Sequence, residues 1–378
     1  MNNKNISVCE LSNYCQPFKG NFIASLFDLE KKIILYNPDN KFIYVFYDNS
    51  KDCSWINEMR QSNKNIFFLK NKYFFGFLVL KNIIKKYDIN IIHSHYTIPV
   101  LLFFLLKIFF PKLVIIAHFH NLFSGIYNIS LFKKKLKTKI KLSLYNKKLI
   151  NLFCGCGEAV YNNLINCGIQ KEKCLFIDNC IDFSRFDNIK TENNFKEIIK
   201  NKKVLLISGY FYFTKGVDIA INAIKDIIDK YNIILMIFCN SKESLMKDIK
   251  NTLGYIPDWI LIVPTQENIS EYFKISNIYL IPSREEGFPY TMLESIYCET
   301  LTIRSDIPST DRNLPNDFVV PLNDSNSLRY CIESVLSLTE NEKISIISKQ
   351  KNYIIQKWNI NIWSNNIINM YLNSLNKV

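Results

Sequence analysis

The chain has 378 residues, 48% of them hydrophobic and 21% charged, as in a globular protein large enough for two α/β domains. Its formal net charge of +13 favours anionic partners, such as nucleotide phosphates, anionic lipid or nucleic acid, without choosing among them. The longest apolar run, residues 98–110, contains Pro99 and Lys107 and falls short of the roughly 20 residues that span a bilayer.

The N-terminus and the cysteines both favour a cytoplasmic protein. The apolar run at residues 6–11 is too short for the core of a signal peptide. The 11 cysteines are odd in number, scattered and without a C-x-x-C pair. We therefore expect reduced thiols, and neither disulfides nor a zinc site.

The first half of the chain alternates short apolar runs with helical patterns, which predicts a parallel sheet covered on both faces. The predicted strands are residues 6–11, 42–47, 66–69, 89–93, 113–117, 149–154 and 174–177. The predicted helices are residues 21–36, 73–87, 99–110, 131–146 and 158–167.

A polar segment, residues 182–201, is predicted to be a linker, and the alternation restarts after it. The predicted strands of this half are residues 204–208, 233–239, 259–263, 278–281, 302–304 and 318–320. The predicted helices are residues 216–231, 242–251, 269–275, 290–298, 325–337, 340–357 and 360–375. We expect two doubly wound α/β domains facing across a cleft, a place where nucleotide ligands often bind.

Two glutamates in the segment 282–294 form the most informative motif. Glu286 is followed by Gly287, where the backbone can turn tightly, and Glu294 lies in the predicted helix 290–298. The strand 278–281 precedes them, so the loop lies at the carboxyl end of a parallel strand, where ligands bind. Two acceptor groups there suit the paired hydroxyls of a sugar or a ribose.

A glycine loop opens the second half, from Gly209 to Lys215 and Gly216, between a strand and a helix. A helix N-terminus offers free amides and a positive dipole end to a phosphate, and Lys215 adds a charge. The ordinary alternative is a solvated lysine before a helix. The combination of this glycine loop and its lysine with the two glutamates favours phosphate binding.

The four histidines lie at the ends of two predicted strands, as His93 and His95, then His118 and His120. Parallel strands end at the same edge of a sheet, so we expect these side chains near one another. A metal site is conceivable, but neither motif holds a carboxylate or a cysteine to complete it. Binding of a substrate hydroxyl or phosphate is the favoured interpretation. Near the N-terminus, Gly20 would permit close backbone approach at the start of a helix.

Residues 131–149 carry eight lysines and no acid, with apolar residues on one helical face. Such a helix can lie on an anionic membrane surface. It can equally be a solvated outer helix whose apolar side packs on the sheet. Both interpretations stay open.

Taken in order, these motifs resemble the retaining glycosyltransferases of family 4 (group 1), which have GT-B architecture. The likeness covers nearly the whole chain, at residues 20, 117–121, 155–159, 179–182, 209–216 and 286–294. The histidine motifs look most like enzymes of bacterial capsule or exopolysaccharide synthesis. The resemblance implies an acceptor-side domain at residues 1–182, a nucleotide-sugar domain at 183–357, and a final helix, 358–378, that crosses back to the first domain.

The resemblance also implies a role for each matching residue. Glu286 would contact hydroxyls of the donor sugar, Glu294 would hold the ribose, and Lys215 would neutralise the diphosphate leaving group. His118 or His120 would sit by the transferred sugar. The other implied contacts are Gly209, Arg284, Gly287, Phe288, Pro289 and Tyr290 for the donor, and Gly20 and His95 on the acceptor side.

One departure from the family pattern bears on the charge of the site. Tyr210 follows the first glycine of the loop, where the family often has an arginine. One positive partner of the diphosphate is therefore missing, unless Arg284 or another base replaces it.

We therefore expect a retaining, metal-independent transferase that uses a nucleotide-diphosphate sugar, with a UDP-sugar favoured, and no cofactor. The expected acceptor is a glycan or a lipid-linked glycan of surface polysaccharide synthesis. We expect the protein to be cytoplasmic, either free or attached peripherally to the inner face of the cell membrane. Two alternatives are a GT-B-fold sugar-nucleotide epimerase or phosphorylase, and a silent membrane-docking partner of another transferase. Nucleic acid is not expected, because the lysines lack an aromatic stacking platform.

Overall fold

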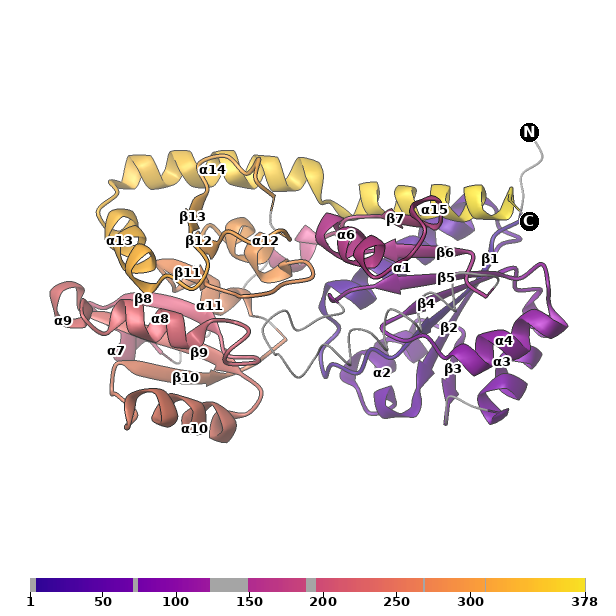
Figure 1. Cartoon of the computed structure of the whole chain (residues 1–378), viewed down its shortest axis with the longest axis horizontal. Coiled ribbons are helices and arrows are strands. Elements are labelled where there is room, and N and C mark those ends of the chain that lie inside the picture. Colours follow the sequence, from indigo (N-terminus) through magenta and orange to yellow (C-terminus); the bar gives the residue numbers. More distant parts are fainter. Residues whose placement is uncertain are drawn as a thin grey trace. The chain divides into compact units, whose positions relative to one another are not determined.

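The computed structural model describes residues 5–70, 74–122, 149–187, 195–267, 269–309 and 311–377. The chain forms two units, Met1–Cys180 with Ile360–Val378, and Ile181–Asn359. Each unit contains one parallel β-sheet with helices packed against it (Figure 1). The predicted basic helix at residues 131–146 lies outside the described residues.

The first unit holds a seven-stranded sheet of order β3-β2-β1-β4-β5-β6-β7, with every described pairing parallel. Its strands are β1 (Ser7–Ser12), β2 (Lys41–Tyr47), β3 (Ile66–Leu69), β4 (Ile91–His95), β5 (Val114–Phe119), β6 (Leu152–Gly155) and β7 (Cys174–Phe176). Its helices are α1 (Gly20–Tyr36), α2 (Ser54–Gln61), α3 (Phe74–Tyr87), α4 (Val100–Phe109), α6 (Glu158–Asn166) and α15 (Ile360–Leu375). The strand order reverses between β1 and β4, so this sheet is doubly wound.

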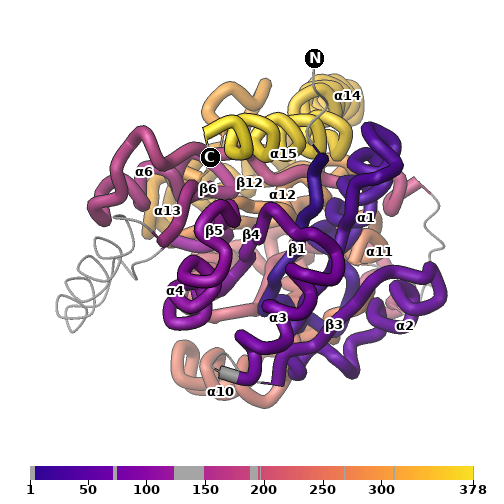
Figure 2. Tube along the Cα trace, turned by 90° about the vertical axis from the view of Figure 1, so that its right-hand side faces the viewer, coloured from indigo at the N-terminus to yellow at the C-terminus, as the bar shows by residue number. Residues whose placement is uncertain are grey.

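The last helix, α15, completes the core of the first unit by packing beside α1 (Figure 2). Its apolar side chains, among them Trp363 and Tyr371, join the buried cluster formed by β1, β2, α1 and α2. Two polar contacts hold it there: the Ser364 hydroxyl donates to Asp28 at 2.6 Å, and Lys32 donates to the backbone carbonyl of residue 361 at 2.9 Å. Helices from opposite ends of the chain therefore share one core.

The second unit holds a six-stranded parallel sheet of order β10-β9-β8-β11-β12-β13. Its strands are β8 (Lys203–Ser208), β9 (Ile233–Cys239), β10 (Ile260–Pro264), β11 (Ile278–Ile281), β12 (Leu301–Ser305) and β13 (Phe318–Val320). Its helices are α7 (Lys196–Ile199), α8 (Val217–Ile224), α9 (Ile228–Tyr231), α10 (Lys242–Leu253), α11 (Ser270–Lys274), α12 (Tyr290–Tyr297), α13 (Ser325–Leu336) and α14 (Glu340–Lys357).

Two apolar cores cover the two faces of this second sheet. Along β8, Leu205 and Ile207 pack with α8, α10 and α13, whereas Val204 and Leu206 pack with α11, α12 and α14. Successive side chains of a strand point to opposite faces, so a continuous run of buried residues supplies both cores. The continuous apolar strands expected from the sequence are confirmed here.

Differences from the predicted elements are local. The helix predicted at 216–231 is interrupted, because α8 ends at Ile224 and the chain turns more tightly there, with Ile227 N donating to Ile224 O at 2.9 Å. Helices α2 and α7 were not predicted, and α7 lies within the segment 182–201 that was expected to be a linker. Strand β4 extends to His95, so both histidines of that motif lie within the strand.

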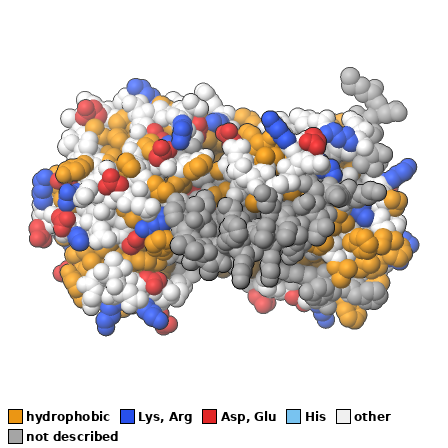
Figure 3. Space-filling model, viewed as in Figure 1, with side chains coloured by type: hydrophobic (Ala, Val, Ile, Leu, Met, Phe, Trp, Pro, Cys, Tyr) orange, Lys and Arg blue, Asp and Glu red, His pale blue; other side chains and the backbone are white. Residues whose placement is uncertain are grey.

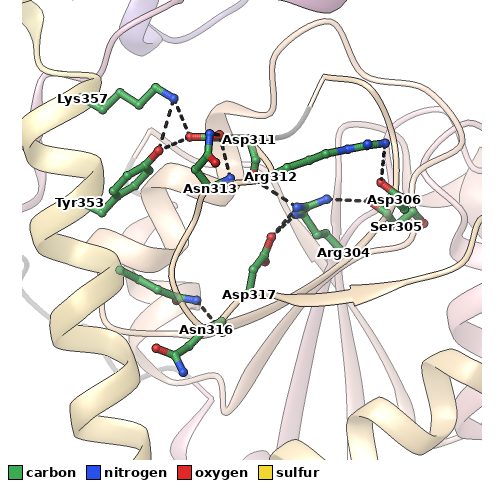
Figure 4. Close-up of polar contacts among 11 residues, drawn as sticks. Arg304, Ser305, Asp306, Asp311, Arg312, Asn313, Asn316, Asp317, Tyr353 and Lys357 are labelled. Atoms are coloured by element: carbon green, nitrogen blue, oxygen red, sulfur yellow. Dashed lines mark hydrogen bonds and ion pairs between the residues drawn. The ribbon is translucent and has the colours of Figure 1, made fainter.

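A polar network fixes the loop after β12 against α14 (Figure 4). Arg304 is buried, and its Nε donates to the Asp317 carboxylate at 2.7 Å. Asp311 accepts from Lys357 Nζ at 2.6 Å and from Tyr353 Oη at 2.5 Å. The buried guanidinium is thus paired, as a buried charge requires, and the long loop is tied to a helix.

Candidate functional site

Two predicted site motifs of the second unit meet where its strand order reverses. Strands β8 and β11 are neighbours, the chain continues from β8 in one direction and from β11 in the other, and α8 and α12 follow them. In the described structure neither helix has a side-chain cap, and their N-cap residues are Gly216 and Pro289. Two helix N-termini, with their positive dipole ends, therefore lie at the edge where doubly wound sheets bind ligands.

Gly216 is the glycine that the loop geometry requires. Its φ is +69°, and a Cβ there would lie 2.0 Å from the carbonyl oxygen of Pro282. The glycine loop and the glutamate loop are also joined by a backbone bond from Arg284 N to Thr214 O at 2.8 Å. The chain bends at Gly287 without a left-handed residue there, since the described glycines with positive φ are residues 20, 168, 216 and 254.

Lys215 and Glu286, both predicted catalytic residues, form an ion pair across this junction. Lys215 Nζ donates to the two carboxylate oxygens of Glu286 at 2.7 and 2.8 Å, and the Ser283 hydroxyl donates to Oε1 at 2.7 Å. Their side chains are 23% and 10% exposed. The lysine is thus positioned by a carboxylate and remains partly accessible, so an anion could compete for it.

Arg284, predicted as a donor contact, is engaged within the second unit. Its guanidinium forms a bidentate pair with Asp218 at 2.8 and 2.7 Å, and its Nε donates to Asn323 at 2.7 Å. It also lies 3.7 Å from the ring centroid of Phe213 and donates to that residue's carbonyl oxygen. Arg284 therefore fastens the glycine loop to the glutamate loop, which is a positioning role.

Tyr210 occupies the position where the family often has arginine. Its hydroxyl donates to Thr265 Oγ1 at 2.5 Å and lies 3.2 Å from Asn240 Oδ1. Burial raises the pKa of the Tyr210 phenol above its ordinary value, so the side chain is neutral. The site thus presents a hydroxyl here instead of a positive charge.

The charges of both glutamates act on one buried tyrosine of β11. Burial raises the pKa of Tyr279, and the charges of Glu286 and Glu294 add to this rise. Glu294 is 8% exposed and lies on α12, where burial and its charge raise the pKa of Cys298 to about 12. Both carboxylates thus follow β11 in the chain, Glu286 in the loop and Glu294 on α12.

The remaining predicted donor contacts lie in the same two loops. Gly209 N donates to Phe238 O at 2.8 Å, and a Cβ on Gly209 would lie 2.8 Å from Ile237. Pro289 is buried, and Phe288 and Tyr290 are half-buried with their ring centroids 5.4 Å apart. Gly209 thus begins the loop that carries Lys215, and Phe288, Pro289 and Tyr290 end the loop that carries Glu286.

The histidines form one buried cluster in the first unit, on adjacent strands. In the strand register Glu10 of β1 lies opposite His93 of β4, and His95 lies opposite His118 of β5. Two chains of hydrogen bonds start at the Glu10 carboxylate. It accepts from Tyr371 Oη at 2.6 Å and from His95 Nε2 at 2.8 Å.

Each chain continues through an imidazole to a second histidine. On the Tyr371 branch, His93 Nδ1 lies 2.6 Å from Tyr371 Oη, and His93 Nε2 lies 3.1 Å from His118 Nδ1. On the other branch, His95 Nδ1 lies 3.0 Å from His120 Nε2. His118 Nε2 and His120 Nδ1 are buried and have no hydrogen-bond partner within the described ranges.

The charge of this cluster follows from its burial. Burial opposes ionisation of Glu10, yet His93 and His95 hold the pKa of this carboxyl below its ordinary value. Burial lowers the pKa of His95 to about 4 and that of His118 well below its ordinary value. With Glu10 ionised and both His95 and His120 neutral, His95 Nε2–H donates to Glu10 and His95 Nδ1 accepts from His120 Nε2–H, so His120 Nδ1 carries a free lone pair.

The cluster corrects one expectation about metal binding. A carboxylate does complete the histidine set, because Glu10 is supplied by β1 and not by either histidine motif. Nitrogen atoms of His93, His95 and His118 lie within 4.8 Å of one another, as metal ligands would. A metal ion would, however, need lone pairs that the histidines now share with each other.

Gly20 lies near this cluster at the start of α1. Its φ is +58°, and a Cβ there would lie 2.8 Å from Tyr14 Oη. Phe22, two residues on, contacts His95 and His120 with ring centroids 5.0 and 5.5 Å apart. The glycine thus allows the turn that places α1 against the histidines.

Two family models match the chain one after the other. "Glycosyltransferase Family 4" matches residues 44–185, and "Glycosyl transferases group 1" matches residues 188–352. No helix in the described ranges is long and apolar enough to cross a membrane.

Curated relatives match over most of their length. An uncharacterised glycosyltransferase of Methanocaldococcus jannaschii is 24% identical over 86% of this chain and 84% of its own. The Campylobacter jejuni N,N'-diacetylbacillosaminyl-diphospho-undecaprenol alpha-1,3-N-acetylgalactosaminyltransferase is 22% identical over 87% of each chain.

Solved structures share the fold. A glycosyltransferase from Rickettsia africae superposes with a TM-score of 0.78 at 16% identity, over 98% of this chain and 99% of its own. Anabaena HepE in complex with UDP gives a TM-score of 0.76 at 13% identity, over 97% and 100%. These matches and the two doubly wound sheets show that the fold is GT-B, and the chain belongs to the group 1 glycosyltransferases of family 4.

Proposed function

We propose that this glycosyltransferase transfers a sugar from a UDP-sugar to a lipid-linked glycan, with retention of configuration at the anomeric carbon and without a metal ion. The observation that carries the proposal is the ion pair of Lys215 and Glu286, held between two helix N-termini. The product would serve surface polysaccharide synthesis at the cytoplasmic face of the membrane.

The leaving group explains why a lysine and helix dipoles suffice. When the bond from the anomeric carbon to the diphosphate breaks, negative charge grows on the diphosphate oxygens. A fixed ammonium and oriented backbone amides stabilise that charge without rearranging, which is the main source of catalysis in such sites. Binding of the diphosphate would displace Glu286 from Lys215 and release the carboxylate to accept from hydroxyls of the donor sugar.

Glu294 would hold the ribose of the same donor. Its carboxylate is 8% exposed and lies on α12, the helix that follows the Glu286 loop. A carboxylate has acceptor sites for two hydroxyl groups, and the cis-diol of a ribose supplies two. This arrangement would bind a ribonucleotide better than a deoxyribonucleotide.

The histidine cluster would contribute an acceptor of hydrogen bonds. Neutral His120 ends its hydrogen-bond chain in a lone pair, which suits a hydroxyl group of a sugar substrate, and the ring of His118 is stacked beside it at 4.6 Å between centroids. Gly20 and His95 would serve the acceptor side of the same unit.

The choice of UDP and of a lipid-linked acceptor is supported by the relatives. Anabaena HepE was solved with UDP and with UDP-glucose. An Escherichia coli relative, 26% identical over 51% of this chain and 52% of its own, is named a UDP-Gal:alpha-D-GlcNAc-diphosphoundecaprenol alpha-1,3-galactosyltransferase. An alpha-linked product from an alpha-configured UDP-sugar retains the configuration.

The test is a transfer assay with the full chain. The protein is incubated with a panel of UDP-sugars and a sugar-diphospho-undecaprenol acceptor, with and without EDTA, and the new linkage is assigned by NMR. We expect transfer from one UDP-sugar, an alpha linkage and no loss of rate with EDTA. Inversion, or a rate abolished by EDTA and restored by a divalent cation, would contradict the proposed mechanism.

A further inference from the structure

The first unit exposes a set of large apolar side chains on two neighbouring helices, which we call the α3–α4 patch. Figure 3 shows hydrophobic side chains gathered over these helices, at the right of the view. On α4 the exposed fractions are 52% for Leu101, 54% for Phe104, 58% for Ile108 and 53% for Phe109. On α3, Phe75 and Leu78 are 68% and 38% exposed; the six side chains make up the patch.

The two helices form one continuous surface. The rings of Phe77 and Phe109 are 5.3 Å apart, and Lys81 Nζ lies 4.4 Å from the Phe109 ring centroid. The opposite side of α4, with Leu102, Phe103 and Leu106, is buried. Helix α4 is therefore apolar on both sides, although only one side is needed for the core.

Such a surface indicates a binding partner. Single exposed apolar residues are ordinary, but a contiguous apolar patch on a folded unit usually marks an interaction site. Helix α10 shows how the outer face of a helix normally looks. Its buried residues are Leu245 and Ile249, and its exposed residues are all polar or charged.

The charge around the patch defines the partner. Helix α3, helix α4 and the following residues 110–112 contain no aspartate or glutamate, and they carry five lysines. These are Lys81, Lys85, Lys86, Lys107 and Lys112. Lys85, Lys86 and Lys112 are exposed. One exposed acid, Asp88, directly follows α3, so the five lysines leave the border of the patch with a net positive charge. An apolar centre with such a border is complementary to the surface of an anionic bilayer.

The same charges disfavour a second copy of the chain as the partner. In a two-fold dimer the patch would face itself, so the lysines of one copy would meet those of the other, with Asp88 as the one acid in residues 74–112 to offset them. Like charges at a desolvated interface are unfavourable, whereas anionic headgroups would neutralise them.

We propose that the α3–α4 patch docks the protein on an anionic lipid bilayer. The phenylalanine, leucine and isoleucine side chains enter the boundary between headgroups and acyl chains, and the lysines contact the headgroups. The six residues of the patch all belong to α3 and α4, and the proposal is argued from their exposure and from the charges of the neighbouring lysines. Vesicle binding is measured without donor or acceptor, so its failure would leave the transfer reaction untouched.

The test is co-sedimentation of the full chain with vesicles of phosphatidylcholine alone and of phosphatidylcholine mixed with phosphatidylglycerol. We expect binding to the mixed vesicles that weakens at high salt, and little binding to phosphatidylcholine. The variant Phe104→Glu/Ile108→Glu should bind about tenfold more weakly or worse, because two apolar side chains no longer partition. Its matched control is Ile344→Glu on α14, where the isoleucine is 63% exposed.

A second variant tests the electrostatic part without altering the apolar centre. Lys85→Gln/Lys86→Gln should weaken binding to mixed vesicles roughly fivefold for each lysine, and should reduce the salt dependence. Lys247→Gln/Lys250→Gln, two exposed lysines of α10, should leave binding unchanged.

Three results would overturn the proposal. One is the absence of binding to mixed vesicles, and another is equal binding by the patch variants and their controls. The third is a wild-type dimer, seen by analytical ultracentrifugation, that Phe104→Glu/Ile108→Glu converts to a monomer without changing vesicle binding. That result would assign the patch to self-association.

Discussion

Lys215 and Glu286 lie 71 residues apart in the sequence, yet the ammonium of one donates to both carboxylate oxygens of the other, at 2.7 and 2.8 Å. The contact arises because β8 and β11 are adjacent in the sheet, so the loops that follow them share one edge. Because the Lys215 ammonium is already held in place by Glu286, an anionic ligand needs only to displace the Glu286 carboxylate in order to bind it.

The variant Lys215→Met should lower kcat for transfer by about 10²–10³-fold, the usual cost of removing one fixed group that stabilises developing charge. The fold should persist, because the lysine side chain is 23% exposed. The measurement is steady-state transfer with the accepted UDP-sugar, with Lys247→Met on α10 as control. Unchanged kcat in Lys215→Met would remove the lysine from the mechanism.

The variant Gly216→Ala should destabilise the second unit, because the residue has a φ of +69° and a Cβ would lie 2.0 Å from Pro282 O. Left-handed backbone costs a non-glycine residue about 1–3 kcal/mol, and the clash adds to it. Gly254→Ala is the matched control, since Gly254 has a φ of +82° with nothing within 4 Å of its Cβ. Urea denaturation should show a larger loss of unfolding free energy for Gly216→Ala than for Gly254→Ala. Equal losses would mean that the glycine loop moves away from Pro282 and relieves the clash.

The strands of both sheets could be predicted because buried parallel strands are continuous apolar runs, such as residues 204–208 and 233–239. Helix α2 was missed because it is short and only Trp55, Ile56 and Met59 are buried. Such a helix owes its stability to packing and leaves little periodicity in the sequence.

In the predicted site, too, local sequence patterns could be read, whereas most contacts between distant residues could not. The motifs led us to expect Lys215 near Glu286, and the two are in contact. The use of Arg284 could not be predicted, because its partner Asp218 lies on another element. Glu10 and Tyr371 were missed, although a glutamate inside an apolar run, residues 6–11, was a signal of a buried polar role. Their contact joins residues 361 positions apart, which no local pattern records.

The variant Tyr371→Phe should destabilise the first unit by about 1–3 kcal/mol, the cost of leaving buried polar groups unsatisfied. The hydroxyl donates to Glu10 and lies 2.6 Å from His93 Nδ1, so its loss leaves a carboxylate oxygen and an imidazole nitrogen without this partner. Tyr330→Phe is the control, since that tyrosine is 63% exposed. If urea denaturation gives both variants the same midpoint, the hydrogen-bond chain contributes nothing to stability.

Acid should weaken the connection between the loop after β12 and α14. Burial opposes the ionised form of Asp311, but hydrogen bonds from Lys357 and Tyr353 hold the pKa of Asp311 below its ordinary value of 3.8. A lowered folded-state pKa stabilises the fold above the unfolded value, and this contribution is lost as the pH falls through the folded pKa. The free energy of unfolding of Asp311→Asn, measured by urea denaturation, should therefore lie below that of the wild type by a constant amount from neutral pH to just above 3.8.

The difference between Asp311→Asn and the wild type should narrow at lower pH, whereas the exposed Asp258→Asn control should show no such change. A gap between Asp311→Asn and the wild type that stays constant below pH 3.8 would show that the ion pair with Lys357 does not set the stability of this loop.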